Sequence, residues 1–173
     1  HTSLQRGEVE EISRALSEAN HSFARRYPGE SNRRQAVHTV YGGAHLFKAD
    51  TAQRLGAVAL RSLGEYAPDS ATLGDVLGIG ANPPLAQKVY DRVVEKLRRE
   101  AIEDFRLDFE DGYGNRADAE EDGHAAASAA EVARGSEAGT LPPFLGIRLK
   151  PLTEDLPARS VRTLDVFLPT LAA

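Results

Sequence analysis

FRLDFEDGYG, at residues 105–114, combines the features of an apolar β-strand with three carboxylates and two glycines. Alternation along a strand places Arg106, Asp108 and Glu110 on one face and the apolar residues on the other. A buried carboxylate needs water, a cation or hydrogen-bond donors, because its transfer into an apolar interior is costly. Carboxylates that gather at the carboxyl end of a strand before a glycine turn are typical of α/β active sites. The alternative is an edge strand with one solvated face.

The rest of the chain alternates between the patterns of strands and helices. β-branched and aromatic residues predict strands near 36–41, 104–110 and 144–150. Apolar spacing and turn residues predict helices near 4–27, 50–63, 73–77, 84–99, 118–134 and 160–171. Such alternation indicates an α/β fold, in which parallel strands are joined by crossover helices. We expect an N-terminal helix and loop over 1–35 and a second domain over 36–173.

Local signals refine the expected helices. Asp50 is expected to cap the helix that follows it, and Ser160 is expected to cap the last one. Pro169 predicts a kink or an early end in that last helix. Glu120 and Glu121 are expected in the first turn of their helix, where they complement its dipole.

The composition is that of an ordinary soluble globular protein, with 41% hydrophobic and 27% charged residues. A net charge of −5 gives no general attraction to nucleic acid or to an anionic membrane. The absence of cysteine excludes disulfides and thiolate metal sites, and it fits a cytoplasmic protein. No apolar run approaches the ~20 residues of a membrane helix. Because the chain starts at His1 and contains no methionine, we expect it to be a portion of a longer protein.

The acidic stretch is a candidate cation site. Asp108, Glu110 and Asp111 offer the oxygen ligands that Mg²⁺ and Mn²⁺ prefer, either directly or through water. Arg148 lies in an otherwise apolar strand and is suited to bidentate binding of a substrate carboxylate. The structural alternatives are that Asp111 caps the following turn and that Arg148 pairs with Asp108 or Glu110. Spacing alone does not separate these interpretations.

Two weaker candidates lie near the first strand. His38 fits no metal-binding motif, and lone histidines are more often structural than ligands, so it is a minor candidate for substrate contact. Gly42 would allow a ligand to approach the backbone closely, or would simply turn the chain.

These motifs resemble the aldolase/citrate lyase family of the HpcH/HpaI type. In that family an Asp-Leu-Glu-Asp strand end is followed by a helix and an Arg-Ile-Asn strand. One branch is more similar still, with His-Thr-Val-Tyr in its first strand and Asp-Phe-Glu-Asp-Gly-Tyr-Gly in its second. In this chain those motifs lie at 38–41 and 108–114, and the resemblance spans about 36–150.

The resemblance implies the first three or so βα units of a TIM (β/α)₈ barrel, incomplete within these residues and preceded by an extra helix. It implies a Mg²⁺- or Mn²⁺-dependent carbon–carbon lyase or aldolase that acts on a 2-oxo acid or acyl-CoA-type substrate through a metal-stabilised enolate. Glu110 and Asp111 would lie near the metal, largely through its waters, and Glu110 would also be catalytic. Arg148 would be both catalytic and substrate-binding, and His38 and Gly42 would contact substrate.

Two features depart from the family pattern. The direct metal ligands of the family, on later strands, have no counterpart here, and Leu149-Lys150 replaces Ile-Asn. The expected partners are a small carboxylate or acyl-CoA substrate and a second copy of the chain, without nucleic acid or membrane. The competing interpretation is a non-catalytic or truncated relative that binds a small acid or packs against partner subunits.

Overall fold

Residues 5–173 are described by the computed structural model. The chain divides into two units, 1–35 and 36–173. The first holds α1 (Arg6–Arg26), which confirms the helix predicted from apolar spacing. At its start the backbone N–H of Gln5 donates to the Glu8 carboxylate at 2.7 Å, which supplies one of the partners that a helix N-terminus lacks.

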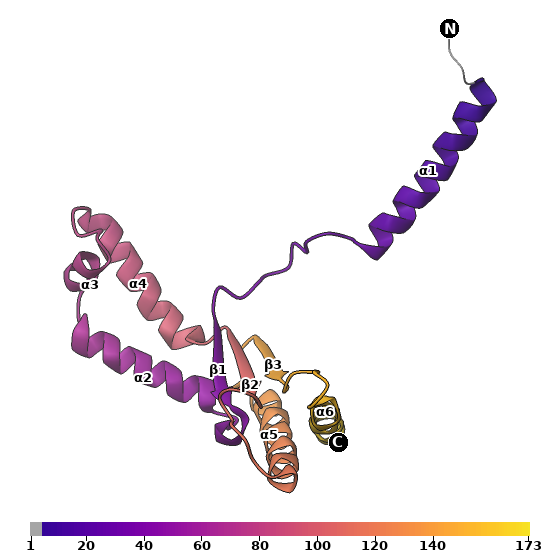
Figure 1. The fold of residues 1–173 in the computed structure, drawn as a ribbon. Helices are drawn as coiled ribbons and strands as arrows, with labels where there is room; N and C mark the ends of the chain where they lie inside the picture. Colours follow the sequence, from indigo (N-terminus) through magenta and orange to yellow (C-terminus); the bar gives the residue numbers. More distant parts are fainter. Residues whose placement is uncertain (1–4) are drawn as a thin grey trace. The chain divides into compact units, whose positions relative to one another are not determined.

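The second unit consists of strands and helices in alternation (Figure 1). Parallel pairing joins β1 to β2 and β2 to β3, so the strand order in space follows the order in the chain. The unit is therefore α/β, as the sequence predicts. In order, its elements are β1 (Thr39–Gly43), η1 (Ala44–Leu46), α2 (Thr51–Tyr66), α3 (Ser70–Val76), α4 (Pro83–Glu100), β2 (Asp104–Asp108), α5 (Asp118–Ala138), β3 (Phe144–Arg148) and α6 (Pro157–Ala172).

One face of the sheet forms the hydrophobic core. Phe105 and Leu107 of β2 are 4% and 0% exposed. They cluster with residues of α5 and α6, including Ala125, Ala129 and Phe167. The alanines of α5 let this helix approach the sheet closely, as its composition indicates, and burial of these apolar groups is the main source of stability. Right-handed crossovers between neighbouring parallel strands place their helices on one face of a sheet, which agrees with this one-sided core.

The opposite face of the sheet is polar. Asp104 of β2 accepts hydrogen bonds from Thr39 Oγ1 at 2.9 Å and from Arg106 Nη2 at 2.8 Å. The Arg106 guanidinium extends over β3, where a Cβ on Gly146 would lie 2.1 Å from its Nη1. Tyr41 of β1 is 56% exposed on the same face. The alternation predicted for the acidic strand is confirmed from Asp104 to Asp108, with charged side chains on one face and apolar ones on the other. The predicted end at residue 110 is wrong, because β2 ends at Asp108 and Glu110 belongs to the turn that follows.

Several element boundaries differ from the predictions. β1 begins at Thr39 and ends at Gly43, whereas the sequence predicts a strand near 36–41, so Gly42 and Gly43 belong to the strand. Asp50 precedes α2 without a side-chain cap, and α6 begins at Pro157 rather than at Ser160. Proline is favoured in the first turn, where its missing N–H costs nothing. Pro169 lies inside α6, in its last turn, and the helix continues to Ala172.

In the part of the chain that the structure describes, no helix combines the length and apolar character needed to cross a membrane.

Glu131 of α5 ties this helix to the segment before α2. It is 7% exposed and accepts hydrogen bonds from the Ala49 N–H at 3.0 Å and Lys48 Nζ at 3.3 Å. Burial raises the pKa of Glu131, but the bonds from Ala49 and Lys48 and the charge of Arg134 outweigh it, so this pKa lies below its ordinary 4.5.

We expect Glu131→Gln to lower the free energy of unfolding by about 1 to 2 kcal/mol at pH 7. A carboxylate with a lowered pKa stabilises the fold above the pKa of the unfolded chain, and this contribution is lost as pH falls through the folded pKa. The difference from the native protein should therefore shrink below about pH 4.5. Thermal melts from pH 3 to 7 measure it, with Glu137→Gln, an exposed carboxylate on α5, as the control. A difference independent of pH would contradict the ionic role.

Candidate functional site

Arg148, the last residue of β3, brings together the three carboxylates of the acidic stretch. Its Nη2 lies 2.9 Å from Asp111 Oδ2 and also pairs with Glu110 Oε2. Its Nη1 lies 3.4 Å from Asp108 Oδ2. Asp108 and Arg148 are direct partners in the β2–β3 register, so the parallel sheet places the acidic strand end and the arginine at one carboxyl edge.

Asp108 shapes the turn that follows β2. The residue is 2% exposed, and its Oδ1 accepts the Glu110 N–H at 2.8 Å while its Oδ2 accepts the Gly112 N–H at 3.0 Å. A Cβ on Gly112 would lie 3.0 Å from Asp108 Oδ2, so the absence of a side chain lets the turn come close to the Asp108 carboxylate. Asp108, and not Asp111, therefore caps the turn. Asp111, with 77% of its side chain exposed, is left facing outward.

The surroundings of Arg148 favour its charged form. Burial acts to lower the pKa of Arg148, but the hydrogen bond to Asp111 and the charges of Glu110 and Asp108 outweigh it and raise this pKa above its usual value. The guanidinium carbon also lies 5.5 Å from the centre of the Tyr41 ring, within the range of cation–π attraction. Tyr41 belongs to β1, so the arginine extends across β2 on the polar face.

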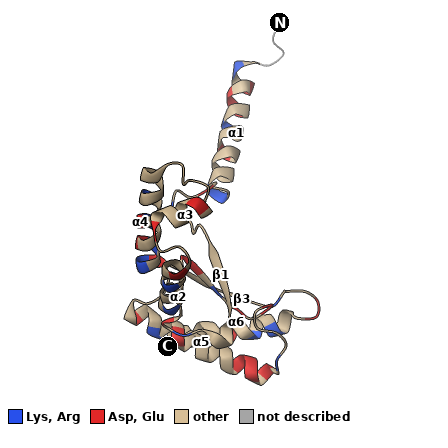
Figure 2. Cartoon of the chain, turned by 90° about the vertical axis from the view of Figure 1, so that its left-hand side faces the viewer, with Lys and Arg blue, Asp and Glu red and all other residues tan. Residues whose placement is uncertain are grey.

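A second charged group joins α5, the segment after β3 and α6 behind this edge. Glu121 is 1% exposed and pairs with Lys150 Nζ. It also accepts a 2.6 Å hydrogen bond from Thr163 Oγ1 and lies 3.5 Å from Arg159 Nε. Figure 2 shows the acidic residues that gather at the N-terminal turn of α5, to which Glu121 belongs. The sequence pattern assigned Glu121 to the helix dipole, whereas the structure makes it the centre of a buried ionic cluster.

Tyr113 lies between this cluster and the edge. It is 5% exposed, and its hydroxyl is 2.6 Å from His124 Nδ1 of α5. Burial and the charge of Glu121 raise the pKa of Tyr113 to about 12, so the phenol is neutral near pH 7. Neither residue was a candidate from the sequence. The available signal was position, because Tyr113 follows a carboxyl strand end and His124 lies on the next helix.

The structure does not bring the remaining predicted residues to this edge. His38 precedes β1, so it lies at the amino end of a five-residue strand, roughly 16 Å from the carboxyl edge. Gly42 faces the core, where a Cβ would lie 2.6 Å from Cζ of Phe105. Its lack of a side chain makes room for that ring. Gly43, the next residue, faces the polar side of the sheet instead.

The edge fits part of a divalent cation site. Glu110 and Asp111 each use one carboxylate oxygen on Arg148, and Mg²⁺ is commonly held by one or two carboxylates plus water and substrate oxygens. Within residues 5–173, however, no group of three or more histidine, aspartate or glutamate side chains is arranged to hold a metal ion. The guanidinium lies among the carboxylates, and a cation would have to share or replace its contacts.

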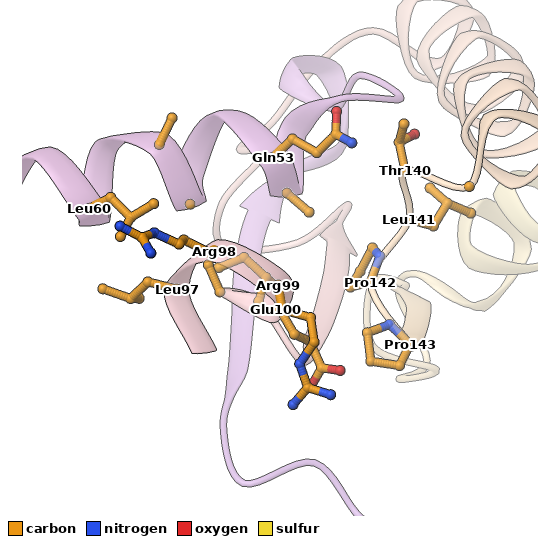
Figure 3. Close-up of a pocket in the computed structure, with 16 residues that line it drawn as sticks. Gln53, Leu60, Leu97, Arg98, Arg99, Glu100, Thr140, Leu141, Pro142 and Pro143 are labelled. Carbon is orange, nitrogen blue, oxygen red and sulfur yellow. The ribbon is translucent and has the colours of Figure 1, made fainter. Parts of the chain in front are cut away.

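A hollow of about 520 Å³ lies elsewhere, between α2, the end of α4 and the loop before β3 (Figure 3). Its lining includes Arg99, Glu100 and Pro142, which immediately precede β2 and β3. It therefore opens at the amino ends of the strands, opposite the Arg148 edge. In parallel α/β folds the chemistry is built at the carboxyl ends, so we assign the candidate site to the Arg148 edge.

Fold and edge together define a parallel α/β protein whose strand ends carry an arginine–carboxylate site. The chain belongs to the DUF6986 family, described as a domain of unknown function, which matches residues 16–173. The match covers all of the second unit and the C-terminal half of α1. A search of curated proteins found no match, and a search of solved structures found none either.

Proposed function

We propose that this chain supplies part of the active site of a Mg²⁺- or Mn²⁺-dependent carbon–carbon lyase or aldolase that acts on a 2-oxo acid or acyl-CoA-type substrate. The observation that carries the proposal is the convergence of Arg148 with Asp108, Glu110 and Asp111 at the carboxyl edge of parallel strands. The motif resemblance to the aldolase/citrate lyase family supplies the reaction class.

We further propose that the three strands belong to a (β/α)₈ barrel. The support is their parallel, sequential order and their division into one apolar and one polar face. In such a barrel the helix-covered face points outward and the other points into the interior. The polar face would then line the barrel and lead to the Arg148 edge.

In this proposal Arg148 binds the substrate carboxylate, since a planar guanidinium matches a carboxylate in bidentate fashion. The same side chain stabilises negative charge that develops on the neighbouring oxygen. Glu110 and Asp111 hold the divalent cation, mainly through water, and Asp108 keeps the turn that presents them. When bound, the cation supplies further positive charge near that oxygen.

Exchange of the methyl protons of pyruvate with D₂O, followed by ¹H NMR, tests the reaction class in the full natural protein. Formation of an enolate is the step shared by enzymes of this class, and exchange reports it without knowledge of the second substrate. We expect exchange that requires Mg²⁺ or Mn²⁺ and that is inhibited by oxalate, a mimic of the enolate. Absence of exchange with both pyruvate and acetyl-CoA would overturn the proposal.

The two outward carboxylates carry a separate prediction. We expect Glu110→Gln combined with Asp111→Asn to weaken Mn²⁺ binding at least tenfold, because both changes remove negative oxygen ligands. Isothermal titration with Mn²⁺ alone measures this effect. Asp155→Asn, in the exposed loop after β3, is the matched control. Unchanged Mn²⁺ affinity in the double variant would remove these residues from the cation site.

The second candidate function is a non-catalytic module that binds a small acid or packs against subunits. It is favoured by the ion pairs that Arg148 makes with three carboxylates of its own chain. An arginine with a purely structural role makes the same kind of contacts. Oxalate binding without any proton exchange would support this alternative.

A further inference from the structure

The helix α1 carries a row of apolar side chains along its length. Val9, Ile12, Leu16, Ala19 and Phe23 follow one another at steps of three and four. The four larger side chains belong to residues that are 47% to 64% exposed, and no residue of α1 is buried. We call these five residues the apolar stripe. Helices in proteins gain most of their stability from packing of such a face, so the stripe calls for a covering partner.

The spacing of the apolar stripe is the seven-residue repeat of a coiled coil. Val9, Leu16 and Phe23 take the a positions of the repeat, and Ile12 and Ala19 take the d positions. This pattern favours a second helix as the covering element. The repeat ends at Arg26, in the next d position, and is short for a coiled coil, so we expect the association to be weak and to depend on concentration.

Side-chain sizes in the apolar stripe favour two copies of α1 that run antiparallel. With the two-fold axis midway between Leu16 and Ala19, each a residue of one copy faces a d residue of the other. Leu16 then meets Ala19, and Ile12 meets Phe23. In a parallel pair each residue meets its own copy, so the smallest side chains leave a hole, the phenyl rings crowd each other and the two Arg26 charges meet.

The charges beside the apolar stripe favour the same direction. Glu8, Glu11 and Arg25 lie on one flank of the helix, at g and c positions. In an antiparallel pair this flank faces itself, so Arg25 of one copy lies level with the Glu8–Glu11 turn of the other, and symmetry makes the attraction twice. Glu18, at a c position near the axis, is free to point into solvent. In a parallel pair the same turn would lie beside Glu10 of the other copy, which repels it.

We propose that α1 is an interaction surface for a second copy of this chain, and that the two helices pair antiparallel through the apolar stripe. Residues 27–35, which connect α1 to the second unit, are all exposed and form no helix or strand. The helix is therefore offered on an extended connection. The pairing is independent of the proposed reaction, because none of its residues belongs to the Arg148 edge.

Sedimentation equilibrium of the full natural protein, over a range of concentrations, tests the surface. We expect Leu16→Asp to weaken an association step about 100-fold or more, because two carboxylates would be placed in the apolar contact. Phe23→Asp should act alike, and thermal melts verify that both variants fold. Arg25→Glu should weaken the same step about fivefold, as for exposed ion pairs. Arg14→Glu, at the outward f position, is the matched control.

Nitroxide labels on single cysteines measure the direction of the pair in the same protein, in a background without other cysteines. Ser17→Cys and Glu10→Cys both lie at b positions, outside the expected contacts. In the antiparallel pair the two labels at residue 17 lie almost level, whereas those at residue 10 are offset by roughly 20 Å along the helix axes. Pulsed electron paramagnetic resonance should therefore give a clearly shorter distance at residue 17 than at residue 10.

Three results would overturn the proposal. The first is a natural protein that does not associate. The second is an association that Leu16→Asp and Phe23→Asp leave unchanged, which would show that the protein's own chain covers the apolar stripe. The third is a distance at residue 17 that is no shorter than the distance at residue 10, which would exclude the antiparallel pair.

Discussion

Glu121→Ala is expected to lower the free energy of unfolding by about 3 to 5 kcal/mol, the range for removal of one partner from a buried ion pair. Glu121 is 1% exposed, and its carboxylate is the shared partner of Lys150, Arg159 and Thr163. Without it, the Lys150 ammonium, whose side chain is 11% exposed, has no carboxylate partner among the described residues, while Arg159 still pairs with Asp122. Urea denaturation at pH 7 measures the change.

The neighbouring residue provides the control for this prediction. Glu120 lies on the same helical turn, has 47% of its side chain exposed and pairs with Arg116 one turn away. Glu120→Ala should cost no more than about 0.5 kcal/mol, as for exposed pairs on helices. Glu121→Gln should fall between the two, because it keeps the shape and loses the charge. Equal effects of Glu120→Ala and Glu121→Ala would show that the buried cluster contributes nothing special to stability.

Arg148→Ala carries the largest expected effect on function. If Arg148 binds the substrate carboxylate and stabilises developing charge, pyruvate proton exchange should slow about 100-fold or more, and oxalate should bind at least tenfold more weakly. Arg148→Lys should not restore either property, because an ammonium group lacks the bidentate geometry of guanidinium. NMR exchange rates and calorimetry with oxalate provide the two measurements.

The control for Arg148 is Arg61→Ala, on the exposed surface of α2, which should leave both properties unchanged. The behaviour of Arg148→Ala separates the two candidate functions. If Arg148→Ala exchanges the pyruvate protons and binds oxalate at native levels, the only role of Arg148 is to neutralise the neighbouring carboxylates. Loss of oxalate binding in a native protein that shows no exchange supports a binding module.

The alternation of one strand was enough to predict much of the second unit. Period-two spacing in residues 105–109 identified which face of β2 is apolar, and the alanines of α5 indicated close packing on the sheet. The meeting of Arg148 with the carboxylates also followed from sequence, because parallel strands end at a common edge. The sequence left open whether Arg148 binds a substrate carboxylate or pairs with carboxylates of its own chain. The observed contacts show that these ion pairs do form.

Other features depend on contacts that spacing does not reveal. Glu121 looks like any acidic residue in a first helical turn, and its burial is decided by Lys150 and Thr163, 29 and 42 residues away. Tyr113 and His124 lacked a recognisable motif because they belong to different segments. Gly42 and Gly43 looked equivalent in sequence, but a strand sends them to opposite faces.

The double role of Asp108 limits how this edge can be redesigned. Its carboxylate accepts two backbone N–H groups of the turn while it also faces Arg148. An amide in its place would offer one acceptor fewer, so the loop would have to rearrange before any new specificity could be expressed. Among the described contacts, the side chains of Glu110 and Asp111 accept no backbone hydrogen bond of this turn. A library aimed at other substrates should therefore vary these two positions and leave Asp108 as the fixed frame on which variants are built.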